Sequence, residues 1–370
     1  MGQYHKLSAE QIQSILEEIT DPYTGQSLLA NKALQTLEIT DERLSLVLEK
    51  SYPTELVQPQ LLELIASTLQ KHFGENAISE DSIQLTVKSN ITAHSMQQTA
   101  QTVDNVKNII AVASGKGGVG KSTVTANLAL SLAKQGARVG VLDADIYGPS
   151  QPKMMGLSGK PEMVGNQMIP LNNYELQVMS IGFMIDDETP VIWRGPMVTQ
   201  ALEQMLRQSK WDSLDYLFID LPPGTGDIQL TLAQKIPIAG AVIVSTPQDM
   251  SLIDARKAVK MFEKVEVPLL GVIENMSTHI CSNCQHEEAI FGTGGGQTMA
   301  DEYKLPFLGS IPLEMGIRQN ADAGKPTVVA EPESATTQRY HEIALFTAGR
   351  LAARKKNYKS LFPNIEISNT

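Results

Sequence analysis

The chain has 370 residues, of which 42% are hydrophobic, so it can build a buried core and is not disordered throughout. At roughly 100–200 residues per domain, this length predicts two or three domains. The 30 lysines and arginines are outnumbered by 41 aspartates and glutamates, and the net charge of −11 argues against a protein that coats nucleic acid, which needs a clustered basic face.

No run of about 18 apolar residues occurs, so the sequence predicts no transmembrane helix. The first residues, MGQYHKLSAEQIQ, lack the apolar stretch of a secretory signal. We therefore expect a cytoplasmic protein with no membrane and no nucleic-acid partner. In a reducing compartment the two cysteines, Cys281 and Cys284, indicate a metal or redox role rather than a structural disulfide.

The first 90 or so residues predict a small α/β unit. A capping box, Ser8 followed by Gln11, opens a helix with isoleucines and leucines on one face. Apolar residues alternate over 44–48 and over 83–87, which is typical of half-buried strands, and a helix from about Pro59 to Phe73 lies between them. The expected order is helix, hairpin, helix, strand.

Residues 91–107 are polar and are expected to form a linker. From residue 108, short apolar runs alternate with amphipathic ones, which predicts an α/β fold with a mostly parallel sheet flanked by helices. The predicted strands are 109–114, 138–143, 176–181, 215–220, 240–246, 269–275 and 307–311. With residues 357–370 as a tail, the two predicted domains are 1–90 and 108–356.

The strongest motif lies between the first of these strands and the helix that follows it. The pattern G-x-x-x-x-G-K-[ST] of a phosphate-binding loop is satisfied by Gly115, Lys116, Gly117, Gly118, Val119, Gly120, Lys121, Ser122 and Thr123. In such a loop, backbone N–H groups and the helix N-terminus surround phosphate oxygens. Lys121 is then expected to reach the β- and γ-phosphates, and the Ser122 hydroxyl to bind Mg²⁺.

The same glycines also spell G-x-G-x-x-G, the pattern of a dinucleotide-binding turn, and Asp143 stands where a ribose-binding acid would. The pair Lys121-Ser122 discriminates between the two interpretations, because a dinucleotide turn needs neither a buried ammonium group nor a magnesium-binding hydroxyl. The sequence therefore favours a P-loop NTPase that binds a nucleoside triphosphate.

Three acids follow strands of the predicted sheet. Asp143 and Asp145 come at the end of strand 138–143, and Asp220 ends strand 215–220 before a Pro-Pro-Gly-Thr-Gly run. At the carboxyl edge of a parallel sheet, beside the phosphate loop, such acids can accept hydrogen bonds from water bound to Mg²⁺. The alternative is that they only start turns, as aspartate often does.

Lys116 is a second lysine in the loop, and an ordinary phosphate loop does not require it. It is either a solvated charge or a charge supplied to the phosphates of a neighbouring subunit. The second interpretation implies a homodimer with nucleotide at its interface.

Cys281 and Cys284 form a C-x-x-C pair, which supplies two of the roughly four ligands that a metal site needs. His279 and His286 could complete a mononuclear zinc site. Alternatively, two such pairs could meet across a two-fold axis and hold an iron–sulfur cluster. A thiol redox pair and inert thiols are the remaining interpretations. The dimer implied by Lys116 favours the shared cluster.

Taken together, these motifs resemble the Mrp/ApbC family of iron–sulfur cluster carrier ATPases, within the MinD-like class that has a deviant phosphate loop. The resemblance covers about residues 108–350. It rests on SGKGGVGKST (114–123), LDADIYGPSQP (142–152), WRGPM (193–197), IDLPPGTGD (219–227), STPQ (245–248), GVIENMS (271–277) and the C-x-x-C pair.

Residues 1–90 resemble the small MIP18-type domain that precedes the ATPase in many bacterial members. The resemblance rests on DPYTGQSL (21–28) and YPT (52–54). This domain has no cysteine, so by itself it cannot hold a cluster through thiolates, and we expect an interaction or assembly module.

For the nucleotide, the resemblance implies that Lys121 and Ser122 bind phosphate and Mg²⁺. Lys116 would be the signature lysine that acts across the dimer. Asn275 in GVIENMS would contact the adenine edge, and a buried asparagine that caps a strand end is the alternative.

For the chemistry, the resemblance implies that Asp145 positions the attacking water and that Asp143 supports the magnesium shell. Asp220 would be the acid of the second switch. Cys281 and Cys284 would bridge a cluster, expected to be [4Fe-4S], between the two protomers.

The leading hypothesis is a slow ATP hydrolase that accepts a labile cluster from scaffold proteins and passes it to apo-proteins. Its ligands would be ATP, Mg²⁺ and the iron–sulfur cluster. One alternative is a spatial-partitioning ATPase of the same fold that binds DNA or membrane, although the acidic net charge disfavours DNA. The other is a nucleotide-gated scaffold without turnover.

Overall fold

The structure, a computed structural model, describes residues 8–40, 43–74, 78–96, 101–184, 195–281, 283–284 and 286–354. The chain divides into two compact units. The first comprises Met1–Ile91 with Lys134–Gly136 and Ala348–Ala353, and the second comprises the remainder. The finer division into 1–90, 91–107 and 108–356 stays a prediction. The tail 357–370 and the first two residues of WRGPM lie outside the described residues.

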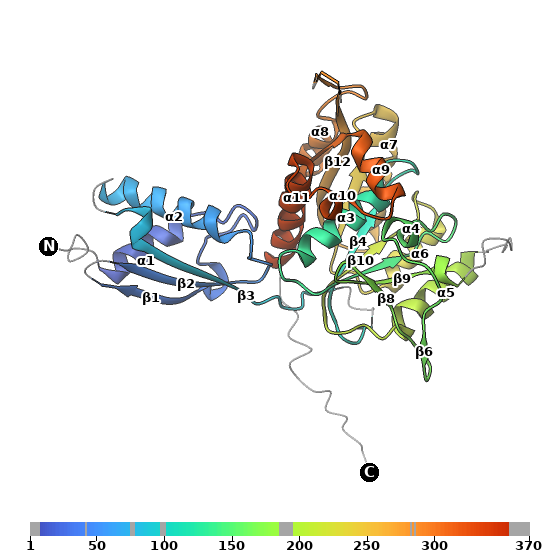
Figure 1. The fold of residues 1–370 in the computed structure, drawn as a ribbon, viewed down its shortest axis with the longest axis horizontal. Helices are drawn as coiled ribbons and strands as arrows, with labels where there is room; N and C mark the ends of the chain where they lie inside the picture. The colour runs from blue at the N-terminus through green and yellow to red at the C-terminus, as the bar shows by residue number, and fades with distance from the viewer. Residues whose placement is uncertain are drawn as a thin grey trace, which may run out of the picture. The chain divides into compact units, whose positions relative to one another are not determined.

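The first unit is a three-stranded sheet with two α-helices packed on it (Figure 1). Its elements are α1 (Ala9–Glu18), η2 (Ala30–Lys32), β1 (Leu34–Ile39), β2 (Leu44–Lys50), α2 (Gln58–Phe73), η3 (Glu80–Ser82) and β3 (Ile83–Ser89). β1 pairs antiparallel with β2, and β2 pairs in parallel with β3. The predicted order of helix, hairpin, helix and strand is confirmed, as is the capping box at Ser8.

A buried polar cluster holds the turn after α1. The Asp21 carboxylate lies 2.9 Å from the Lys50 ammonium group and accepts from the Tyr52 hydroxyl at 2.7 Å. Burial lowers the pKa of Lys50 and raises the pKa of Tyr52. Asp21 also accepts from the backbone N–H of Tyr23 at 3.0 Å. Removing one partner of such a buried pair leaves the other unpaired, so the cluster fixes the turn in one arrangement.

The second unit is built on a nine-stranded sheet. Its strands are β4 (Val106–Ala113), β5 (Val139–Asp143), β8 (Leu171–Asn173), β9 (Leu176–Ser180), β10 (Leu214–Asp220), β11 (Gly240–Ser245), β12 (Leu269–Ile280), β13 (Glu287–Glu288) and β14 (Phe307–Leu313). The order is β13-β12-β11-β4-β10-β5-β9-β8, and β14 also pairs with β12. Only β8 and β13 pair antiparallel, so the predicted, mostly parallel sheet is confirmed. β6 (Met163–Val164) and β7 (Gln167–Met168) form a separate hairpin.

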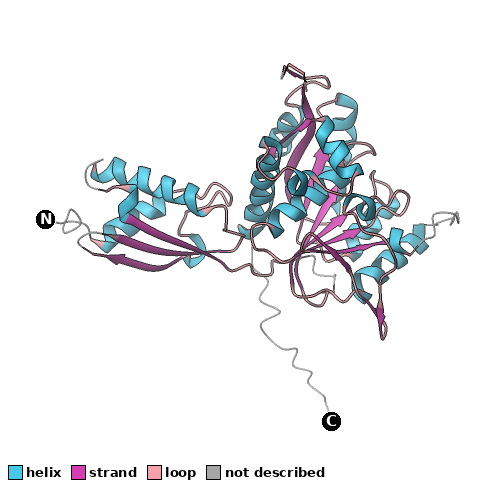
Figure 2. Cartoon of the chain, viewed as in Figure 1, coloured by secondary structure: helices cyan, strands magenta, loops and turns pink. Residues whose placement is uncertain are grey.

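Helices flank this sheet (Figure 2). They are α3 (Lys121–Ala133), α4 (Gln151–Met154), η4 (Ile181–Phe183), α5 (Gly195–Gln208), α6 (Asp227–Lys235), α7 (Asp249–Lys264), α8 (Gly295–Tyr303), α9 (Met315–Asp322), α10 (Thr327–Ala330) and α11 (Ala335–Ala352). One group of contacting helices is α3, α4, α9 and α10, and another runs from α5 through α6 and α7 to α8. Because the sheet is covered, every residue of β5, β10 and β11 is buried.

Three strands, β4, β12 and β14, extend beyond their predicted bounds by two residues or more. β4 begins at Val106, inside the segment expected to be a linker, where Ile91, His94 and Val103 are also buried. β12 continues to Ile280 rather than ending at residue 275, because its last part pairs with β13 and β14. The extensions of β4 and β12 mix polar and apolar residues without a clear strand pattern, so backbone pairing forms them.

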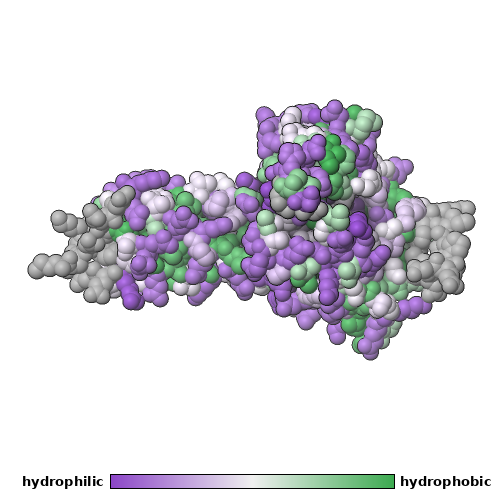
Figure 3. Space-filling view, turned by 45° about the horizontal axis from the view of Figure 1, so that its top comes forward, coloured by the Kyte–Doolittle hydropathy of each residue, from purple (hydrophilic) through white to green (hydrophobic). Residues whose placement is uncertain are grey.

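On the face drawn in Figure 3, hydrophilic residues cover most of the surface and apolar residues form small patches. Scattered apolar residues of this kind are normal on globular proteins and mark no interface by themselves. Among the described residues, none of the helices combines the length and the apolar character that a membrane crossing requires.

Candidate functional site

The glycine-rich loop joins β4 to α3 at the carboxyl edge of the sheet. Gly118 and Gly120 have φ angles of 82° and 81°, which residues with a Cβ rarely adopt. Lys121 is the first residue of α3, so the helix begins at the loop and its N-terminal N–H groups have no partner within the helix. A loop and helix arranged in this way can bind phosphate.

Two of the glycines allow other elements to approach the loop closely. A Cβ on Gly115 would lie 2.1 Å from the backbone carbonyl carbon of Asp254 in α7, and one on Gly120 would lie 2.2 Å from Asn275 Nδ2. The Asn275 amide donates to the Val119 carbonyl at 2.8 Å. The loop is therefore supported by α7 on one side and by β12 on the other.

Lys121 forms an ion pair with Asp220, and their side chains are only 5% and 0% exposed. The same carboxylate accepts from Thr125 Oγ1 at 3.3 Å, and Lys121 Nζ lies 3.4 Å from Ser122 Oγ. The lysine thus has a protein partner at the end of β10. A bound phosphate group would compete with Asp220 for this charge.

The acids meet because of the strand register. Asp220 on β10 is opposite Asp143 on β5, and Asp143 is opposite Ser180 on β9. Asp143 Oδ2 accepts from Ser180 Oγ at 3.2 Å and from the backbone N–H groups of Ser150 and Gln151 at 3.0 Å. Burial, followed by the charge of Asp220, raises the pKa of Asp143 to about 7.

Asp145 and Lys116 are less enclosed. Asp145 is partly exposed, and burial raises its pKa although the Lys121 charge opposes the shift. Its backbone N–H donates to Asp143 Oδ1 at 3.1 Å. The Lys116 carbonyl accepts from Ser114 Oγ at 2.9 Å, whereas its ammonium group makes no ion pair with any described residue. Both side chains can therefore respond to a ligand or a second subunit.

Gln151 is a buried site residue that the motif search did not single out. Its Nε2 donates to the Ser122 carbonyl at 3.0 Å and to Asp220 Oδ2 at 2.9 Å. It therefore ties the serine of the phosphate loop to the acid at the end of β10. The signal in the sequence was its place shortly after β5, in the stretch that also carries Asp143 and Asp145.

The oxygen atoms around the loop suit a hydrated Mg²⁺ ion. Ser122, Asp143 and Asp145 offer the hard oxygen ligands that this ion prefers, and it usually keeps several waters. Ser150 Oγ and Gln151 Oε1 are buried and have no hydrogen-bond partner in the described part of the chain. Because buried polar atoms normally have partners, ordered water around an ion fits here.

A cavity of about 390 Å³ lies beside the loop. Gly120, Thr123 and Asn275 line it together with apolar residues, among them Pro312 and Ile317. A pocket with mostly apolar walls and a few polar groups suits the base of a nucleotide whose phosphates lie on the loop.

The two cysteines stand at the tip of a β-hairpin rather than in an isolated loop. Ile280 at the end of β12 pairs with Glu287 of β13. Next to this pair, the Cys281 N–H donates to the His286 carbonyl at 2.9 Å. Cys281 is partly exposed, Cys284 is exposed, and both are free thiols. The hairpin therefore presents two sulfur atoms to solvent.

The backbone of the hairpin favours the thiolate form of Cys281. Hydrogen bonds from the backbone N–H groups of Cys284 and Asn283 lower the pKa of the Cys281 thiol, and the thiolate is the form that binds metal. Within the described ranges, no group of three or more His, Cys, Asp or Glu residues could hold a metal ion. His279 Nδ1 lies 3.0 Å from the Leu313 carbonyl. The described residues therefore lend no support to a zinc site within one chain.

The parallel sheet, the glycine-rich loop that opens α3, and the buried lysine beside two strand-end acids define a nucleotide-binding P-loop NTPase. More particularly, the chain belongs to the family described as NUBPL iron-transfer P-loop NTPase, whose model matches residues 105–347. A second model, described as iron–sulfur cluster assembly protein, matches residues 9–79. The resemblance drawn from the motifs is confirmed.

Similar proteins carry related names. The iron–sulfur cluster carrier protein of Haemophilus influenzae is 47% identical over 336 residues, which is 90% of this chain and 90% of that protein. The iron–sulfur cluster transfer protein NUBPL of Mus musculus is 50% identical over 252 residues, 67% of this chain and 79% of that protein. A nucleotide-binding protein from Archaeoglobus fulgidus, solved in complex with ADP, has a TM-score of 0.55 and 41% identity, and the match covers 62% of this chain and 90% of that one.

Proposed function

We propose that this chain is an ATP-dependent carrier of iron–sulfur clusters that works as a homodimer. The observation that carries the proposal is the hairpin with two free, solvent-accessible thiols and no third ligand among the described residues. A cluster needs about four protein ligands, so a second chain must supply the other two. A two-fold axis at the hairpin tip provides them and leaves the cluster, expected to be [4Fe-4S], exchangeable when the protomers separate.

ATP is proposed to place its phosphates on the glycine-rich loop and its base in the cavity beside Asn275. Ser122 would bind Mg²⁺ directly, and Asp143 would accept from water in its shell. The ion would neutralise charge on the β- and γ-phosphates. Lys121 would exchange its contact with Asp220 for a phosphate oxygen, which frees the acid at the start of the Pro-Pro-Gly-Thr-Gly run to change its partners.

Hydrolysis is proposed to depend on Asp145 and Lys116. Asp145 is close enough to the loop for the Lys121 charge to affect its pKa, and it would hold the attacking water. Lys116, whose ammonium group is unpaired among the described residues, would reach the phosphates of the partner subunit. Turnover would be slow, because a loop of this kind supplies positioning and charge without an arginine finger.

One strand connects the two sites. Asn275 on β12 contacts the phosphate loop, and Cys281 follows six residues later, directly after the strand ends at Ile280. Between them Met276 has a φ of 57°, and the pairing of β12 with β14 shifts register between Asn275 and His279. We infer that a change at the loop reaches the hairpin through this irregular joint.

Anaerobic reconstitution tests the carrier proposal. Iron, sulfide and native mass should give one cluster per dimer, and Cys281→Ala or Cys284→Ala should abolish it while ATP affinity stays within about two-fold. His279→Ala is the matched control, because a zinc site that used this histidine would lose its metal, whereas the shared cluster should be retained. Zinc at one ion per monomer would overturn the proposal.

Phosphate release separates the carrier from a scaffold without turnover. The wild type should release inorganic phosphate slowly, and Asp145→Ala should release almost none. Equal, zero release from both proteins would favour the scaffold.

The proposed setting is the cytoplasm, with scaffold proteins as cluster donors and apo-proteins as recipients. The first unit is proposed to be an interaction or assembly module.

The competing function, spatial partitioning on DNA or membrane, predicts ATP-dependent co-sedimentation with DNA or vesicles. Neither should be seen.

A further inference from the structure

We propose that a basic groove along α7 binds an acidic segment of a partner protein, a function beyond cluster carriage itself. The groove has a volume of about 470 Å³ and is separate from the cavity beside the phosphate loop. Half of its eight lining residues are cations on one helix: Arg256, Lys257, Lys260 and Lys264. The chain as a whole has a net charge of −11, so four cations along one groove are more positive charge than its average composition predicts.

The acidic side chains that pair with these cations are exposed or partly exposed, so the carboxylates of a ligand can displace them. Arg256 pairs with Glu302 at 2.9 Å, Lys257 with Asp254 at 2.9 Å and Lys260 with Glu263 at 2.8 Å. The side chains of these pairs are 32–62% exposed, and surface pairs of this kind contribute only about 0–1 kcal/mol each. Lys264 is exposed and has no ion pair in the part of the chain that the structure describes. An incoming carboxylate can therefore pair with Lys264 or displace an existing partner.

The spacing of the cations favours a peptide over a single phosphate group. Arg256, Lys260 and Lys264 follow one another at every fourth position, so they lie on one side of α7 over about 12 Å at 1.5 Å per residue. Alternate side chains of an extended peptide repeat at about 6.6 Å, close to the 6 Å between these positions. Two or three carboxylates on one edge of a peptide can meet this row, whereas one phosphate can meet only part of it.

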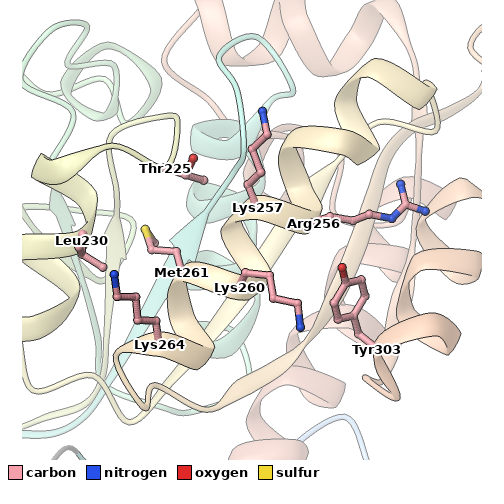
Figure 4. Close-up of a pocket in the computed structure, with 8 residues that line it drawn as sticks. All are labelled: Thr225, Leu230, Arg256, Lys257, Lys260, Met261, Lys264 and Tyr303. Atoms are coloured by element: carbon pink, nitrogen blue, oxygen red, sulfur yellow. The ribbon is translucent and has the colours of Figure 1, made fainter.

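Apolar side chains complete the groove. Figure 4 shows Arg256 and Lys260 extending from α7 toward Tyr303 of α8, with Met261 and Lys264 on the side of Leu230 of α6. Lys260 Nζ lies 4.9 Å from the centre of the Tyr303 ring. Tyrosine, methionine and arginine are enriched at protein interfaces, whereas the lysines favour an acidic partner through charge complementarity. The matching segment carries carboxylates with apolar residues between them.

The groove also borders the nucleotide site. Thr225, which lines it, belongs to the loop between β10 and α6. In that loop, the Gly224 N–H donates to the carbonyl of Ser114 at 3.0 Å, directly before the glycine-rich loop. α7 itself lies against Gly115. A partner held on α7 would thus touch a segment whose position depends on the phosphate loop.

The test uses the full chain and a fluorescein-labelled ten-residue peptide that alternates glutamate and leucine. Affinity is measured by anisotropy at low and high salt, and it should fall as salt rises. The variant Arg256→Gln/Lys260→Gln/Lys264→Gln should bind the peptide about ten-fold more weakly, since three ion pairs with the peptide are lost. Its basal phosphate release should match that of the wild type.

The matched control is Lys134→Gln/Lys210→Gln/Lys325→Gln, which removes the same charge at exposed lysines that line neither cavity. It should keep the peptide affinity within about two-fold. Equal loss in both variants, or no peptide binding at low salt, would overturn the proposal. Displacement of the peptide by millimolar inorganic phosphate, or binding to anionic vesicles without peptide binding, would also overturn it by assigning the groove to another ligand.

Discussion

The phosphate loop and the cysteine hairpin are built in opposite ways. The loop is enclosed by α7 at Gly115 and by Asn275 at Gly120, and its lysine is paired with a buried acid. The hairpin is open, with one thiol exposed and the other partly exposed. The buried lysine, the acid it pairs with and the contacts that support the loop all come from one chain, whereas the hairpin supplies two sulfur ligands and no third ligand among the described residues.

This contrast indicates that the two sites have different roles. A preorganised, buried site loses little freedom when its ligand binds, so the loop can select one diffusible nucleotide in one geometry. Under the proposed function, the open hairpin with two sulfur ligands would hold a cluster only while a second pair of ligands is present. Substitutions in the loop should therefore leave both thiols free to react, and substitutions of the cysteines should leave ATP binding unchanged.

The largest effect is expected from Lys121→Met, which changes the phosphate loop and leaves the hairpin unchanged. It leaves Asp220 buried without its partner, at an expected cost of about 3–5 kcal/mol in the free energy of unfolding, and removes the charge proposed to meet the phosphates. Denaturant unfolding and calorimetric ATP binding measure the two effects. The double variant Lys121→Met/Asp220→Asn should regain most of the stability but no ATP affinity. If it regains no stability, the ion pair does not hold this region together.

Gly115→Ala is expected to act next most strongly, because the new methyl group would meet the backbone of α7, which cannot move aside cheaply. We expect a loss of about 1–3 kcal/mol in stability and weaker ATP binding. Gly148→Ala is the control, since nothing lies within 4 Å of a Cβ there. Thermal unfolding of both variants checks the prediction, and equal destabilisation would contradict it.

Asp143 should make the nucleotide-free protein less stable as the pH rises. Its folded pKa of about 7 lies above the usual value of about 3.9, so the folded state binds the extra proton. The stabilising contribution is present at low pH and is lost as the pH rises through 7. Between pH 5 and pH 8 the wild type should lose about 2 kcal/mol more than Asp143→Asn. Parallel losses in denaturant titrations would show that this carboxyl group does not titrate there.

The smallest expected effect concerns the hairpin. Because two backbone N–H groups lower the pKa of the Cys281 thiol, its alkylation should have a midpoint below the ordinary value of about 8.5. Iodoacetamide labelling at a series of pH values, mapped by mass spectrometry, measures this midpoint. In the denatured chain the midpoint should return to about 8.5. A midpoint that is the same in both states would mean that the hairpin does not activate the thiol.

The sheet was predictable because strands covered on both faces consist of apolar runs, and β5, β10 and β11 each lie within a residue of their predicted bounds. The phosphate loop was predictable because its glycines, lysine and serine are adjacent in sequence. The second half of β12 was missed, since its polar residues carry no strand pattern and are ordered by pairing with β13 and β14. Gln151 was missed because its contacts are with Ser122 and Asp220, both distant in sequence.

By itself the sequence determined the α/β fold, the nucleotide loop and the pair of thiols, because each depends on residues that are neighbours along the chain. Only the tertiary structure decided that Asp143 and Asp220 share one buried edge, that Asn275 supports the loop, and that the thiols stand at the tip of the hairpin whose first strand carries Asn275. These arrangements arise from strand register and packing, which bring together groups that no local pattern connects.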